Sequence, residues 1–301
     1  MISAHEKIIQ LEKGGHIALD EYGDPHGLPV FFCHGWPSSR AMAALTDDAA
    51  CELGLRIISP DRPGIRQSTH QPGRRLLDWP PLLRELAANL EIEKFRILAI
   101  SGGAPYAYAA AWSMPDQVEA IAVVSGAPPI DKLTDENGLL TLHRWMLAMY
   151  RSRPELLRKL FHVARPFASF RIPFRLRPVM IKIFQPCDAA VMRDAKAFEA
   201  CFESQRQAWR ISAEGVMVDA EIYVRDWGFP LEEITVPVRL WHGKFDRTFA
   251  FRLAEAVAAR LPNCEKHIVE NAGHFSLPIR QIHQILADLK QAGTTAGTSV
   301  T

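Results

Sequence analysis

The stretch Arg96-Ile97-Leu98-Ala99-Ile100-Ser101-Gly102-Gly103-Ala104-Pro105-Tyr106-Ala107 is the most informative part of the chain. An apolar run ends at a serine, two glycines follow, and an alanine-rich helical pattern begins. A sharp strand-to-helix turn strains the backbone of its serine and needs small neighbours, because strand and helix pass close together. Such a turn exposes the Ser101 hydroxyl to a base and a substrate. Since Ser-Gly-Gly also occurs in ordinary turns and phosphate-binding loops, the assignment of a nucleophile depends on its partners.

Short apolar runs alternate with helical patterns on both sides of this stretch. The alternation predicts βαβ units and a mostly parallel sheet flanked by helices, which is the α/β class. Strands are expected at residues 8–11, 17–22, 30–33, 56–59, 96–100, 120–125, 238–242 and 266–269, and helices at 41–52, 80–90, 104–113, 249–261 and 280–291.

Residues 129–229 follow a different pattern, with helical periodicity, many prolines, large aromatics and no convincing strand. We predict that this segment is an α-helical cap over the ends of the sheet, where open α/β sheets bind ligands. Segments 1–128 and 230–291 then form the core. The Gly/Thr/Ser-rich residues 292–301 are expected to be a flexible tail.

The first part of the cap is strongly basic. Residues 151–182 contain nine Lys and Arg residues against one acid, Glu155, and phenylalanines 161, 167, 170 and 174 lie among them. This pattern is typical of a solvated helix face whose arginine stems cover apolar surface. It also allows an anionic substrate or a weak contact with a membrane surface.

Composition limits the classes of protein to consider. The 301 residues are 48% apolar and 23% charged, as in a globular protein, and a net charge of +1 argues against a nucleic-acid partner. Neither a signal peptide nor a membrane span is evident, and five scattered cysteines suggest a cytoplasmic location. We expect no metal and no cofactor, because ligand spacing and a dinucleotide fingerprint are both missing. The oligomeric state is not decided, and a homodimer is kept open.

A base and an orienting acid for Ser101 can be placed after the last two predicted strands. His274 lies in the glycine-containing loop 271–275, where it could take the serine proton and deliver it to a leaving group. Asp246 lies three residues after Gly243, where a carboxylate can hold the imidazole N–H. The alternative for Asp246 is an N-cap of the following helix.

Donors for an oxyanion are expected at the loop after residue 33 and at the serine turn. Gly35 lets the chain turn, so that the Trp36 N–H faces the pocket. The Gly102 N–H supplies a second donor at the start of a helix.

Five ordered motifs together resemble the α/β-hydrolase-fold serine hydrolases over nearly the whole chain. They are His-Gly-x-Pro at 34–37, Asp-Arg-x-Gly at 61–64, the nucleophile turn at 101–103, His-Gly-x-x-Asp at 242–246 and Gly-His-Phe at 273–275. The resemblance implies an α/β-hydrolase fold with a helical cap inserted after the sixth strand. It also implies an esterase-like enzyme that needs no cofactor.

Two positions depart from the family pattern. Ala99 replaces the first glycine of the turn and is small enough for close packing. Arg66 replaces a glycine, loses freedom at positive φ and adds a charge near the site. Arg66 could pair outward, contact an anionic substrate or damage the site, so we take it with Phe275 as a substrate-binding candidate.

The expected function is hydrolysis of a small to medium ester or thioester through an acyl-enzyme on Ser101. Hydrolysis of an amide or a carbon–carbon bond on the same triad is the main alternative. A cofactor-independent oxygenase and a non-catalytic ligand-binding protein are further alternatives. Dehalogenase and epoxide-hydrolase chemistry is disfavoured, because those relatives carry an aspartate at the position of Ser101.

Overall fold

The centre of the fold is an eight-stranded sheet in the order β1-β2-β4-β3-β5-β6-β7-β8. The computed structural model describes residues 5–133 and 135–293. The strands are β1 (His5–Gln10), β2 (His16–Gly23), β3 (Leu28–Cys33), β4 (Leu55–Pro60), β5 (Phe95–Ile100), β6 (Val118–Val124), β7 (Val238–Gly243) and β8 (Cys264–Val269). Strand β2 is antiparallel to β1 and β4, and the other neighbouring pairs are parallel. The predicted α/β class is confirmed.

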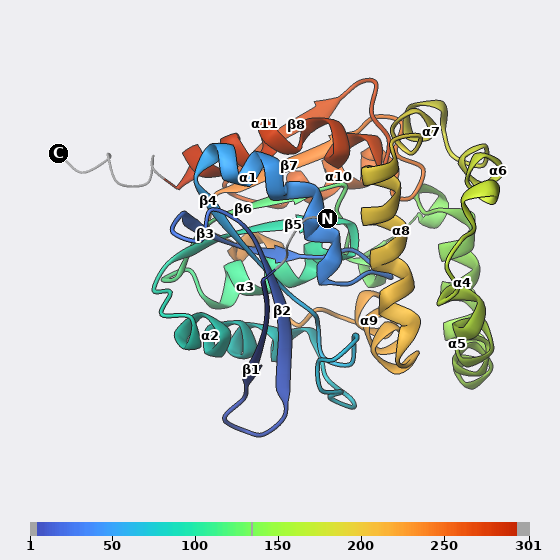
Figure 1. Cartoon of the computed structure of the whole chain (residues 1–301), viewed down its shortest axis with the longest axis horizontal. Coiled ribbons are helices and arrows are strands. Elements are labelled where there is room, and N and C mark those ends of the chain that lie inside the picture. Colours follow the sequence, from blue (N-terminus) through green and yellow to red (C-terminus); the bar gives the residue numbers. More distant parts are fainter. Residues whose placement is uncertain (1–4, 134, 294–301) are drawn as a thin grey trace.

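Helices cover both faces of this sheet (Figure 1). On one face lie α1 (Asp47–Leu53) and α11 (Ser276–Ala292), and on the other lie α2 (Trp79–Asn89), α3 (Ala104–Ser113) and α10 (Phe251–Ala258). The successive residues Phe31 and Phe32 of β3 belong to the two different cores, and both are fully buried. Burial on both faces explains why the central strands are continuous apolar runs.

Three expected helices have different boundaries in the structure. The pattern over 249–261 forms a helix, α10, only over residues 251–258. The pattern over 41–52 is divided into a 3₁₀ segment, η1 (Arg40–Thr46), and α1, because buried Asp61 and Asp20 hold the start of η1 through Arg40. Helix α11 begins at Ser276 rather than near residue 280.

Between β6 and β7 the chain forms a layer of helices beside the sheet (Figure 1). They are α4 (Thr141–Ser152), α5 (Pro154–Ala168), α6 (Arg177–Ile181), α7 (Pro186–Val191), α8 (Ala195–Arg210) and α9 (Glu214–Val224). The other 3₁₀ segments of the described chain are η2 (Leu76–Asp78), η3 (Ser101–Gly103), η4 (Ile130–Lys132), η5 (Glu136–Gly138), η6 (Phe174–Leu176) and η7 (Leu231–Glu233). None of the helices within residues 5–133 and 135–293 is both long and apolar enough to cross a membrane.

The cap boundaries at 128/129 and 229/230 stay a prediction. Of the expected tail, Ala292 is the last residue of α11 and is buried. Residues 294–301 lie outside the described part of the chain.

The topology brings the candidate residues to one edge of the sheet. Every neighbouring pair of strands from β3 through β5, β6 and β7 to β8 is parallel. The carboxyl ends of these strands therefore lie at the same edge of the sheet. The loops that hold Trp36, Ser101, Asp246 and His274 follow the ends of β3, β5, β7 and β8. This edge is where ligands bind in open α/β sheets.

Candidate active site

Ser101 occupies a strained turn between β5 and α3. Its φ of 53° is the left-handed conformation, which costs energy for a residue with a Cβ. The glycines that follow are needed for space. A Cβ on Gly103 would overlap the Cys33 carbonyl oxygen, and one on Gly102 would stand 2.7 Å from the Trp36 Cβ. Strand and helix therefore meet too closely for larger residues.

Three residues distant in sequence form one hydrogen-bonded chain. His274 Nε2 lies 2.9 Å from Ser101 Oγ, and His274 Nδ1 lies 2.8 Å from Asp246 Oδ2. All three side chains are buried. A hydroxyl, an imidazole and a carboxylate in this order form the arrangement that activates a serine for attack on a carbonyl.

The two oxygens of Asp246 have different partners. Oδ1 accepts hydrogen bonds from the backbone N–H groups of Thr248 and Phe249 at 2.7 and 3.0 Å, which leaves Oδ2 for His274. The carboxylate thus orders its own loop and also faces the imidazole. The N-cap alternative is wrong, because Ala250 precedes the following helix α10 and no side chain caps that helix.

The electrostatics of this pair favour an ion pair. Burial alone would raise the pKa of Asp246, but the charge and hydrogen bond of His274 lower it below its ordinary value. Burial alone would likewise lower the pKa of His274, whereas the Asp246 carboxylate raises it above its ordinary value. Asp246 therefore stabilises the imidazolium that forms when His274 takes a proton.

The loop after β3 is anchored by a buried arginine. Arg62 donates from Nη1 to the His34 carbonyl at 2.6 Å and from Nη2 to the Gly35 carbonyl at 2.8 Å. Across the described residues, the backbone N–H groups of Trp36 and Gly102 donate to no protein acceptor. Both are available to a bound group.

The counter-charge for Arg62 comes from α9. Arg62 Nε donates to Asp219 Oδ2 at 2.7 Å, Arg74 pairs with Oδ1, and the Tyr106 hydroxyl donates to Oδ1 at 2.8 Å. Burial would raise the pKa of Asp219, but Arg62 and Arg74 hold it below its ordinary value. From the same helix, the Tyr223 hydroxyl donates to the Gly102 carbonyl at 2.8 Å.

The two substrate-binding candidates lie in different places. Arg66 lines neither cavity of the site, because the buried carboxylates of Asp20 and Asp61, each 3.9 Å away, hold its guanidinium elsewhere. It adopts the left-handed conformation itself, with φ of 49°. Phe275 does reach the site and lines the smaller cavity beside His274.

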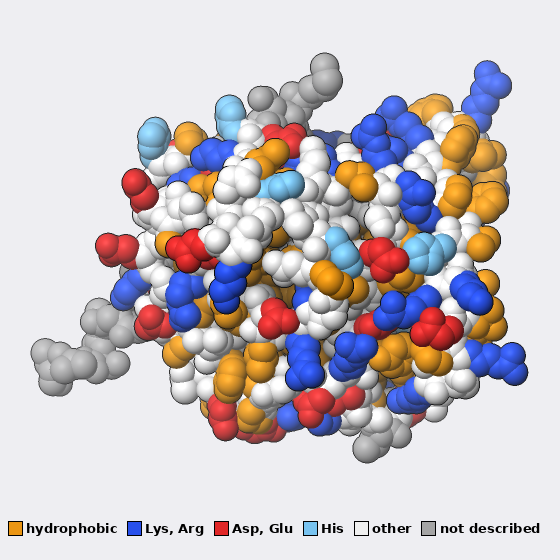
Figure 2. All heavy atoms as spheres, turned by 90° about the horizontal axis from the view of Figure 1, so that it is seen from below, with side chains coloured by type: hydrophobic (Ala, Val, Ile, Leu, Met, Phe, Trp, Pro, Cys, Tyr) orange, Lys and Arg blue, Asp and Glu red, His pale blue; other side chains and the backbone are white. Residues whose placement is uncertain are grey.

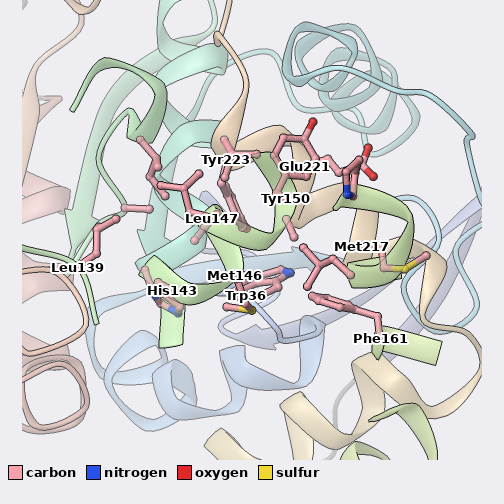
Figure 3. Close-up of a pocket in the computed structure, with 18 of the residues that line it drawn as sticks. Trp36, Leu139, His143, Met146, Leu147, Tyr150, Phe161, Met217, Glu221 and Tyr223 are labelled. Atoms are coloured by element: carbon pink, nitrogen blue, oxygen red, sulfur yellow. Dashed lines mark hydrogen bonds between the residues drawn. The ribbon is translucent and has the colours of Figure 1, made fainter. Parts of the chain in front are cut away.

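Ser101 lies between two cavities. The larger encloses about 820 Å³, counting its open mouth, and Ser101 and Gly102 form part of its wall. The rest is mostly apolar, and several of its residues are labelled in Figure 3: Trp36, Leu139, Met146, Leu147, Phe161 and Met217. The smaller, of about 450 Å³, lies at His274 and includes the polar residues Ser38, Ser204 and Gln205.

A family model described as the alpha/beta hydrolase family matches residues 30–287. The chain belongs to the alpha/beta hydrolase family. An uncharacterized hydrolase from Bacillus subtilis, YcgS, is 24% identical over 233 residues, which are 73% of this chain and 75% of that protein.

Solved structures share the alpha/beta hydrolase fold. An esterase from Thermogutta terrifontis has a TM-score of 0.67 and 20% identity, over 97% of this chain and 99% of the other. A bromoperoxidase from Bacillus anthracis has a TM-score of 0.71 and 18% identity, over 95% and 100%. The epoxide hydrolase CorEH has a TM-score of 0.68 and 21% identity, over 96% and 98%. At these identities the likeness shows the fold alone.

Several residues of this hydrolase site escape sequence reasoning. Asp219 and Tyr223 hold the core loops from the cap, and Asp188 accepts from the N–H groups of Phe275 and Ser276 beside the candidate base. The available signal for Asp219 is a single acid inside the apolar run 216–220. His143 lines the larger cavity, where burial lowers its pKa to about 4 and keeps it neutral.

No resident metal can be assigned from these residues. In the described part of the chain, no three His, Cys, Asp or Glu side chains are grouped so that they could hold an ion. The expectation that the hydrolase needs neither a metal nor a cofactor stays a prediction.

Replacing Asp219 with Asn should destabilise the hydrolase by about 3 to 5 kcal/mol, because Arg62 and Arg74 are left buried without their counter-charge. Urea unfolding measures this loss. Glu270→Gln removes a carboxylate from an exposed pair with Lys244 and serves as the control, with little expected change. Equal midpoints for the two variants would show that the cluster does not stabilise the fold.

Proposed function

We propose that this protein hydrolyses ester or thioester bonds through an acyl-enzyme, without a cofactor. The observation that carries the proposal is the placement of His274, 2.9 Å from Ser101 Oγ and 2.8 Å from Asp246 Oδ2. His274 takes the proton as Ser101 Oγ attacks the carbonyl carbon. The oxyanion that forms is held by the N–H groups of Trp36 and Gly102.

The second half of the reaction uses the same residues. His274 passes its proton to the leaving alcohol or thiol, which departs and leaves the acyl group on Ser101. His274 then takes a proton from water, whose oxygen attacks the acyl carbon. The collapse of this second intermediate frees the carboxylic acid, and the proton returns to Ser101 Oγ.

The two cavities suggest how the substrate lies. Since His274 protonates the leaving group, the leaving group must be near Nε2, and the smaller, partly polar cavity is the one that His274 lines. Gly102, a proposed oxyanion donor, lines the larger apolar cavity instead. We therefore assign the acyl chain to the larger cavity and a small alcohol or thiol to the smaller one.

The cysteines support a serine nucleophile and the expected cytoplasmic location. All five carry free thiols. Burial raises the pKa of Cys33 and of Cys201 to about 12, so neither provides a reactive thiolate at neutral pH. Free thiols persist in a reducing compartment.

A fluorophosphonate probe should label the wild-type protein at Ser101, and Ser101→Ala should lose labelling and at least about 10⁴-fold in ester turnover. Mass spectrometry of the labelled peptide and a spectroscopic ester assay give the two readouts. Ser152→Ala, on the surface of α4, is the control that keeps both. Full turnover by Ser101→Ala would point to the oxygenase alternative, and ligand binding without turnover by wild type would point to a binding protein.

The pH dependence of kcat/KM should report His274. Activity needs the neutral imidazole, so kcat/KM rises with pH, and its midpoint lies above the ordinary histidine value because Asp246 raises the pKa of His274. Asp246→Asn removes the charge, so the midpoint should fall and kcat should drop about 10⁴-fold. Asp116→Asn, at an exposed position, should change neither. An unchanged midpoint in Asp246→Asn argues against the pair.

Acyl chain length should control the rate. For esters of one small alcohol, kcat/KM should rise about fourfold for each added methylene until the larger cavity is full. Leu147→Trp narrows this cavity and should shift the preference to shorter chains, whereas Leu142→Trp on the exposed side of α4 should not. A rate that instead follows the length of the alcohol would reverse our assignment of the two cavities.

A further inference from the structure

Helix α5 has apolar residues on two of its faces. Pro154, Leu157 and Phe161 line the larger cavity. A second row, at spacings of three and four residues, is exposed to solvent: Leu156 (41%), Leu160 (38%), Val163 (66%) and Phe167 (80%). Residues at these spacings share one side of a helix. Among the described residues, none of the hydrophobic clusters of the core includes a member of this outer row.

The apolar surface continues beyond the helix. Exposed apolar residues of the segment that follows, of α6 and of the turn after it are Phe170 (67%), Phe174 (76%), Leu176 (53%), Val179 (63%) and Ile183 (80%). We call these residues and the outer row of α5 the cap face. Figure 2 shows hydrophobic side chains gathered along one edge of the molecule with Lys and Arg among them. A contiguous surface of this kind marks an interaction site.

The charges around the cap face are almost all positive. Glu155 is the only acid from residue 151 to 182. Some of the basic residues are paired elsewhere, as Arg158 is with Glu221 and Arg177 with Glu199. Lys159, Arg175 and Lys182 are exposed, and within the described residues their side chains have no ion pair or hydrogen bond, so their charges are free to meet an external anion.

We propose that the cap face docks on a bilayer that contains anionic phospholipids. Apolar side chains that enter the boundary between headgroups and acyl chains, flanked by cations that meet the phosphates, are the combination that such a surface favours. A second copy of the chain fits less well. In a two-fold dimer the same face meets itself, so its uncompensated cations would be brought together.

Docking places the lipid on one face of α5, while residues of a neighbouring face line the larger cavity. An apolar acyl substrate in the bilayer is therefore held close to its cavity. Only this consequence rests on the proposed hydrolase function. Adsorption to the bilayer is a property of the cap face alone.

The test is co-sedimentation of the full chain with vesicles of phosphatidylcholine containing about one-third phosphatidylglycerol. We expect binding that falls as salt is raised, and at least about tenfold weaker binding to pure phosphatidylcholine. Phe167→Ser should weaken binding to the anionic vesicles, whereas Ile8→Ser, at an exposed residue of β1, should not. The triple variant Lys159→Gln, Arg175→Gln, Lys182→Gln should lose about fivefold for each charge removed.

Further variants show whether binding depends on the position of the charges rather than on their number, and whether it is independent of catalysis. The triple variant Lys13→Gln, Lys94→Gln, Arg280→Gln removes the same charge from other exposed positions and should bind as wild type does. Ser101→Ala should also bind normally, so a failure of the proposed chemistry leaves the docking test intact. Phe167→Ser should hydrolyse a short soluble ester at the wild-type rate if that chemistry holds.

Three results would overturn the docking proposal. Wild type could fail to bind the anionic vesicles, or the cap-face variants could bind as well as their controls. Sedimentation velocity could also show a dimer that Phe167→Ser dissociates, which would assign the cap face to a second copy of the chain.

Discussion

The buried pair between Arg62 and Asp219 is the constraint on which the geometry of the site depends. A guanidinium with no solvent contact needs a counter-charge, and here it comes from α9 in the cap. The remaining donors of Arg62 hold the carbonyls of His34 and Gly35, which fixes the loop that carries the Trp36 N–H. Tyr223, on the same helix, holds the Gly102 carbonyl. The loops that carry the Trp36 and Gly102 N–H groups, which we propose as the oxyanion donors, are thus both held from α9.

A second carboxylate, Asp188, connects the cap to the loop that carries His274. Asp188 of α7 accepts from the N–H groups of Phe275 and Ser276 at the start of α11, where a negative charge is favoured by the helix dipole. Its charge also contributes to the raised pKa of His274, after the larger effect of Asp246. A Cβ on Gly273 would stand 2.6 Å from both Asp188 oxygens, so the glycine lets α7 approach this closely. The cap therefore contacts the backbone next to two members of the hydrogen-bonded chain, at Gly102 beside Ser101 and at Phe275 beside His274.

Short sequence patterns predict those features of the structure that depend on interactions between residues close together in the chain. The turn at Ser101, the apolar strands and the order of Ser101, Asp246 and His274 follow from short stretches of sequence, because turn chemistry and two-sided burial act over a few residues. The partners of Arg62 and of the 275–276 backbone lie in the cap, 157 and 88 positions away, and no short pattern pairs them. The early start of α11 was missed for the same reason, since the carboxylate at its first turn comes from α7. Arg66 was assigned from its charge alone, and two buried aspartates decided where it lies.

Helix α9 places most of its cavity-lining residues on a different side from the residues that anchor the core loops. On α9, Met217, Ala220 and Val224 line the larger cavity and share one side of the helix, because they lie three and four positions apart. Asp219 and Ile222 lie on the other side, against the core. A substitution on the cavity side changes the space for an acyl chain and leaves the Arg62 anchor in place, whereas one on the core side disturbs the loops that carry the N–H groups. Tyr223 is the exception, because it lines the larger cavity and also holds the Gly102 carbonyl. At Met217, Ala220 and Val224 the cavity can be reshaped without disturbing the loops beside Ser101, so one fold can host different substrates.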